Sequence, residues 1–109
     1  AEQGIKLAQA NDLIVKAVEQ RPRDGYIADS LGWVLYQSGN YKRAVPELER
    51  AVQLRPNDAT INDHLGDAYW KVGRRLEARF QWSKAKNMKI DAGHLESINK
   101  KLEQGLEDK

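Results

Sequence analysis

The residues best suited to acid–base or metal chemistry lie around one histidine. His64 follows Asp63 directly and precedes Asp67 by three residues. An imidazole exchanges protons near neutral pH, and imidazole and carboxylate groups are common zinc ligands. If this segment is helical, His64 and Asp67 share one face of the helix. Two ligands on one helix do not make a tight site without a third from elsewhere, so we interpret His64 as a structural or solvated histidine and predict no metal site.

Catalytic chemistry finds little other support. His94 is the only other histidine, and it lies in no recognisable nucleophile or metal motif. The chain has no cysteine, which excludes disulfides and cysteine nucleophiles but is compatible with a reducing or an oxidising compartment. Its glycines form no phosphate-binding loop. We therefore predict that the chain is not an enzyme and needs no cofactor, and the sequence does not indicate its localisation.

A basic segment over residues 71–89 could carry out a second kind of chemistry, the binding of anions. Seven basic residues stand against the single acid Glu77, an excess that could attract phosphates or an acidic partner. The net charge of the chain is only +2, however, and no nucleic-acid-binding motif is present. Nucleic acid is therefore the weaker alternative as a partner. The basic residues are Lys71, Arg74, Arg75, Arg79, Lys84, Lys86 and Lys89.

The elements that carry these residues recur along the chain. With 109 residues, 40% hydrophobic and 31% charged, the chain can bury one core, and it contains no apolar run long enough to cross a membrane. A shift of 34 residues superimposes identical residues in one register, as stacked repeat units do. The superimposed pairs are Asp24 and Asp58, Leu31 and Leu65, Gly32 and Gly66, Gly39 and Gly73, Ala44 and Ala78, and Ala51 and Ala85.

Apolar spacing predicts two helices in each repeat. The first helix covers about residues 25–38, between a capping Asp24 and the terminating Gly39, and the second ends before Pro56. In the second copy we expect the inward stripe of the second helix to contain Leu76, Ala78, Trp82 and Ala85, with Trp82 in the core. Small residues at the shared positions allow antiparallel helices to approach closely.

The two ends depart from the repeat. After Ile90, Asp91 can cap a last helix with one apolar stripe, which we expect to cover the final hairpin and to bury Phe80. At the other end, a helix near residues 7–20 lacks a partner and leaves an uncapped edge that could serve self-association. Because the chain begins with half a repeat, we expect it to be a piece of a longer protein.

The repeated pattern of residues resembles the tetratricopeptide repeat, and it is similar to bacterial members of that family. The resemblance rests on Leu31, Gly32, Ala44, Ala51 and Pro56 in one copy and on Leu65, Gly66, Tyr69, Ala78 and Ala85 in the next. It implies an all-α, right-handed superhelical stack of antiparallel helix pairs. The implied units are a partial repeat over 1–24, full repeats over 25–58 and 59–92, and a C-terminal capping helix over 93–109.

The resemblance also implies a protein–protein interaction scaffold. In this family the first helix of each pair lines a concave groove, and helical spacing identifies the side chains that face it. We expect the peptide-binding residues to be Tyr26, Asp29, Trp33, Tyr36, Thr60, Asp63, Asp67, Trp70 and Lys71.

The composition of this face suggests the partner. Exposed aromatic rings supply binding hot spots, and carboxylates favour a peptide with basic or aromatic side chains. Trp33 and Trp70 could instead pack between hairpins, and the acidic stripe could be solvated surface. A purely architectural or oligomerisation role in a longer array is the main alternative function.

Overall fold

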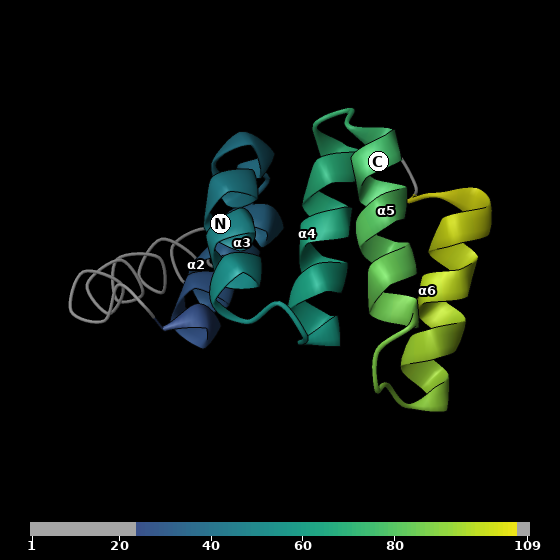
Figure 1. Ribbon diagram of the computed structural model, residues 1–109. Helices are drawn as coiled ribbons and strands as arrows, with labels where there is room; N and C mark the ends of the chain where they lie inside the picture. The colour runs from purple at the N-terminus through teal and green to yellow at the C-terminus, as the bar shows by residue number, and fades with distance from the viewer. Residues whose placement is uncertain (1–23, 107–109) are drawn as a thin grey trace.

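The computed structural model describes residues 24–106, and within them it contains five helices and no strand (Figure 1). The predicted all-α repeat stack is therefore confirmed, whereas the predicted partial repeat over 1–24 lies almost wholly outside the described residues. No helix in this described part is long and apolar enough to span a membrane. The helices are α2 (Gly25–Gln37), α3 (Tyr41–Leu54), α4 (Ala59–Lys71), α5 (Arg75–Lys86) and α6 (Ala92–Gln104).

Residue type fixes where the helices begin and end. The Asp24 carboxylate accepts hydrogen bonds from the amides of Tyr26 and Ile27, and Asp58 and Asp91 cap α4 and α6 in the same way. The turn inside each pair passes through a glycine with positive φ, +84° at Gly39 and +87° at Gly73. Three aspartates and two glycines therefore divide residues 24–106 into two hairpins and a last helix.

Close packing within each hairpin depends on the glycine of its first helix. A Cβ atom added to Gly32 would lie 2.5 Å from Leu48 Cγ on α3, and one added to Gly66 would collide with the Trp82 ring on α5. Leu48 and Trp82 are both fully buried. Each hairpin therefore pairs one large side chain with a glycine, which brings the helices close together.

The last helix extends the stack by half a unit. In Figure 1, α6 lies beside α5 at the C-terminal side of the second hairpin. Ile98 of α6 is fully buried in the common core, and Leu102 and Leu106 pack against it. The expected capping helix is thus present in the part of 93–109 that the structure describes.

Two expectations about α5 are wrong. Leu76 is 85% exposed and Phe80 is 64% exposed, although we expected Leu76 in the inward stripe and Phe80 beneath α6. Both project from the side of α5 opposite Ala78 and Trp82, because residues 76 and 80 differ from 78 and 82 by about half a turn of helix. The last helix packs along another side of α5, where the Arg79 guanidinium donates a hydrogen bond to the carbonyl of Leu102.

We predict that Gly66→Ala destabilises the chain. The added methyl group overlaps the fully buried Trp82 ring, and overpacking of this kind costs about 1 to 3 kcal/mol. Gly32→Leu and Ala51→Leu should have a cost of the same order. Urea denaturation followed by circular dichroism measures the midpoint. Gly93→Ala serves as the control, because its Cβ would approach only Asp91; equal midpoints for all variants would show that the helix pairing is misassigned.

Candidate functional site

The nine predicted binding residues lie on α2 and α4, but they differ in exposure. Tyr26 and Thr60 are exposed. Four more are half-buried: Asp29, Trp33, Tyr36 and Lys71. The remaining members on α4 are buried: Asp63, Asp67 and Trp70 keep only 7%, 6% and 7% of their surface. The structure brings Trp33 and Tyr36 into an aromatic cluster and Asp63 and Asp67 into an acidic cluster, and the other five lie outside both. The binding role of all nine stays a prediction.

The aromatic cluster consists of Trp33, Tyr36, Tyr41 and His64. The Trp33 indole stacks on Tyr36 with ring centroids 4.6 Å apart and on the His64 imidazole at 3.8 Å, and Tyr41 of α3 meets Tyr36 edge-on at 5.2 Å. His64 Nδ1 lies 2.8 Å from Oδ1 of Asp29, which holds the imidazole against the indole. His64 thus joins α4 to α2, and its carboxylate neighbour is Asp29 rather than Asp63 or Asp67.

The Tyr36 hydroxyl of this cluster is shifted toward its neutral form. Burial, followed by the charge of Asp67, raises the pKa of the Tyr36 hydroxyl well above its ordinary value. Tyr36 is therefore a neutral phenol at physiological pH. A neutral, half-buried aromatic ring can contact another ring or an apolar side chain without desolvating a charge of its own.

A pocket adjoins the aromatic cluster at Tyr41. It has a volume of about 430 Å³ and lies between the turn of the first hairpin and the end of α4. The Lys71 ammonium stands 5.8 Å from the centroid of the Tyr41 ring. The pocket thus offers a depression beside the stacked rings. Its lining residues are Gly39, Asn40, Tyr41, Lys42, Lys71 and Val72.

The acidic cluster pairs α4 with the last helix. Lys101 Nζ lies 2.9 Å from Oδ1 of Asp63 and 3.0 Å from Oδ1 of Asp67, and His94 Nε2 lies 2.9 Å from Oδ2 of Asp63. The Trp82 indole donates a further hydrogen bond of 3.0 Å to Asp67. Both carboxylates therefore already have partners within the chain.

Burial controls the titration of this cluster. Desolvation, with a smaller effect of Asp63, raises the pKa of Asp67 to about 6, against the lowering effect of Lys101. Burial also lowers the pKa of Lys101, but the charges of Asp67 and Asp63 outweigh it and the pKa lies above its ordinary value. The ammonium therefore stays charged between the two carboxylates.

Sequence reasoning did not identify the two α6 members of this cluster. One signal was available, because Lys101 follows Asp67 by one repeat period of 34 residues. In a repeat stack, residues one period apart lie on neighbouring helices. A lysine 34 residues after an aspartate therefore indicates a possible ion pair between those helices. His94 occupies the position equivalent to Thr60 and does not pair with it, so period alone could not have located its partner.

Trp70 is buried among neighbouring elements of the stack. Its indole lies 5.6 Å from the Trp82 ring, and Arg75 and Arg79 stand over it at 4.6 Å and 5.5 Å. A Cβ atom at Gly105 would collide with this ring, so the chain after α6 closes over it. We expected Trp70 either to face the groove or to pack between hairpins, and its surroundings agree with packing. Trp33 remains half-exposed within the aromatic cluster.

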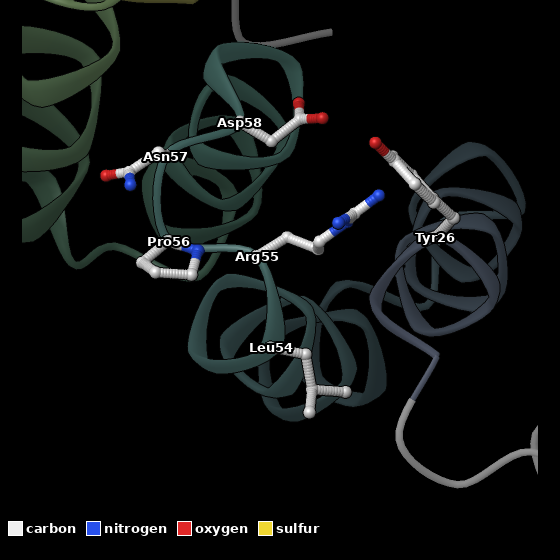
Figure 2. A pocket seen from close by; sticks show the side chains of 6 residues that line it. All are labelled: Tyr26, Leu54, Arg55, Pro56, Asn57 and Asp58. Carbon is white, nitrogen blue, oxygen red and sulfur yellow. The ribbon is translucent and has the colours of Figure 1, made fainter.

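A second pocket lies at the opposite end of the first hairpin, with a volume of about 300 Å³ (Figure 2). The Arg55 guanidinium lies 4.0 Å from the centroid of the exposed Tyr26 ring. Figure 2 shows Arg55 and Asp58 directed toward Tyr26, while Asn57 points away. Among the described residues, no group of three or more His, Cys, Asp or Glu side chains is placed to hold a metal ion.

Comparison with known families gives a match to a repeat family. The family model described as a TPR repeat matches residues 32–73, from Gly32 in α2 through α3 to Gly73 after α4. The matched segment contains the whole aromatic cluster and both halves of its adjoining pocket. No curated protein is significantly similar to the chain.

Proposed function

We propose that the chain is a non-catalytic scaffold that binds a peptide of a partner protein on α2 and α4. The match of residues 32–73 to the family model of the tetratricopeptide repeat supports this proposal. The tetratricopeptide repeat is a protein–protein interaction motif. We place the contact at the aromatic cluster and its adjoining pocket, rather than along all nine predicted residues. An architectural role in a longer array is the alternative; the N-terminal edge on which self-association depends lies outside the described residues.

One observation carries this proposal. Trp33, Tyr36 and His64 stack in one surface that is only half-buried, beside a pocket of about 430 Å³. Pockets of this size hold side chains of a ligand, and rigid aromatic rings bury area at little cost in conformational entropy. The stacking holds Trp33 in place before a ligand arrives, so little entropy is lost when the ligand binds.

The charges around the cluster favour an aromatic over a basic ligand. Asp29 contacts His64, and Asp63 and Asp67 contact Lys101, so these carboxylates have partners within the chain. A basic peptide would have to displace those partners to gain an ion pair. Lys71 also lines the pocket, where its positive charge disfavours a basic side chain of the ligand. We propose a peptide that inserts an aromatic side chain and carries no net positive charge.

We predict that Trp33→Ala abolishes most peptide binding without unfolding the chain. Affinity for a short peptide should be micromolar, on the order of −8 kcal/mol, and truncation of a central aromatic removes about 2 kcal/mol or more. The test screens acetylated, amidated peptides with a single Phe, Tyr or Trp in a polar background against the chain by amide chemical shifts. Shifts should gather at Tyr36, Tyr41 and Lys71.

The matched control is Tyr26→Ala, which removes another exposed aromatic ring from the same helix but outside the cluster. Its affinity should equal that of the wild type. Peptide shifts that gather at Tyr26 and Arg55 would move the site to the other end of the hairpin. Shifts spread over Arg74, Arg75 and Lys86 that disappear as salt rises would instead favour the phosphate-binding alternative.

A further inference from the structure

The outer side of α5 exposes two apolar side chains that the fold does not use. Leu76 and Phe80 are 85% and 64% exposed, and they lie four residues apart on one helix, where side chains are neighbours. The repeat shift places Lys42 and Pro46 at the equivalent positions of α3. The first hairpin therefore forms with a lysine and a proline where the second has a leucine and a phenylalanine.

Positive charge borders these two residues. Arg75 and Arg79 precede Leu76 and Phe80 in the sequence, and Lys84 follows Phe80 by one helical turn; all three are exposed. The Arg75 and Arg79 guanidinium groups contact the Trp70 ring, and Arg79 also contacts a carbonyl oxygen. Neither an indole ring nor a carbonyl carries a net charge, so these contacts do not neutralise the positive charge of Arg79.

The one acid on α5 does not cancel this field. Glu77 is held by Arg74, whose Nε donates a hydrogen bond of 2.8 Å to Oε1. This pair is neutral as a unit, so Glu77 does not offset the positive charge of Arg79, Lys84 and Lys86. An apolar pair with a basic border complements a surface of opposite character: apolar in the middle and acidic at its edges.

We propose that Leu76 and Phe80, with the basic side chains beside them, form a second protein-binding surface that receives an acidic amphipathic helix of a partner protein. The apolar face of that helix covers Leu76 and Phe80, and its flanking carboxylates approach Arg79 and Lys84. This surface is on α5 and is separate from the aromatic cluster on α2 and α4, so the chain can hold two protein segments at once. The proposal does not depend on the peptide site proposed above.

The test uses the full chain and a fluorescein-labelled peptide with leucines at i, i+3, i+4 and i+7 and glutamates at the other positions. We expect micromolar binding by fluorescence anisotropy. The variant Leu76→Lys/Phe80→Lys should bind about tenfold or more weakly, although it carries two additional positive charges. A peptide with the same composition and scrambled leucines should bind weakly to both chains.

A charge-matched control separates apolar docking from attraction alone. Gln53→Lys/Gln104→Lys adds two positive charges at exposed positions on α3 and α6 and should bind the peptide at least as well as the wild type. Trp33→Ala should also leave this binding unchanged, which distinguishes this surface from the peptide site. Circular dichroism checks that each variant keeps its helices.

Four outcomes would overturn the proposal. They are an absence of binding by the wild-type chain, equal binding by the Leu76→Lys/Phe80→Lys variant, a concentration-dependent dimer in sedimentation that this variant abolishes, and binding to phosphatidylserine vesicles that it abolishes. The third would assign the patch to a second copy of the chain, and the fourth to a membrane surface.

Discussion

The Trp82→Ala variant should unfold at urea concentrations at which the wild-type chain is still folded. Trp82 is fully buried, fills the space above Gly66 and packs against Trp70. Truncation of a buried tryptophan costs about 3 to 5 kcal/mol, and a domain of this size has a total stability of about 5 to 15 kcal/mol. The variant also removes the hydrogen bond to Asp67, leaving that buried carboxylate with fewer partners.

Phe80→Ala is the matched control for this experiment. It truncates an aromatic residue two positions earlier on the same helix, but at 64% exposure it should change stability by no more than about 0.5 kcal/mol. Trp82→Phe separates the two effects of Trp82, because it keeps a ring and loses the indole donor. Similar urea midpoints for Trp82→Ala and Phe80→Ala would contradict the core described here.

The fold could be predicted because the same pattern of residues occurs in two copies of the repeat. Leu31 and Leu65, or Gly32 and Gly66, occupy equivalent positions, so each copy supports the assignment of the other. The capping aspartates and the turn glycines act through local backbone geometry, which sequence reports directly. Leu76 is hydrophobic but exposed, because its helical phase relative to Ala78 and Trp82 places it on the outer side of α5.

The candidate site was less predictable because it depends on contacts across repeats. Asp63 and Asp67 read as a free acidic stripe on α4, but Lys101 lies more than thirty residues away in sequence and pairs with both. Likewise, the stacking of His64 on Trp33 depends on how α4 packs on α2. Composition and helical spacing identify the face on which a residue lies, but they do not identify what covers that face.

Lys101→Met should destabilise the chain strongly at neutral pH. The variant keeps the length of the side chain but removes the cation between Asp63 and Asp67, which are 7% and 6% exposed. Breaking a buried ion pair by removing one partner costs about 3 to 5 kcal/mol, and we expect the lower end because Lys101 retains 17% of its side-chain exposure. Lys100→Met, at the neighbouring exposed position of α6, is the control and should be nearly neutral.

The pH dependence of the destabilisation by Lys101→Met tests whether it is electrostatic in origin. In the folded chain the pKa of Asp67 is about 6, above its ordinary value of 3.8. Between these two pH values the Asp67 carboxyl is therefore protonated in the folded chain and ionised in the unfolded chain. The contribution of Asp67 to stability therefore falls as pH rises from about 4 to about 6. Removing the Lys101 cation raises this pKa further, so the Asp67 carboxyl of the variant is neutral in acid and needs no cation there.

The difference in free energy of unfolding between Lys101→Met and the wild type should thus be about 3 kcal/mol at about pH 8 and at most about 1 kcal/mol near pH 4.5. Urea titrations at the two pH values measure it, and the carboxyl carbon shift of Asp67 follows the titration itself. A difference that is the same at both pH values would mean that Lys101 stabilises α6 through the packing of its aliphatic stem. In that case the acidic cluster would not be what attaches the last helix to the stack.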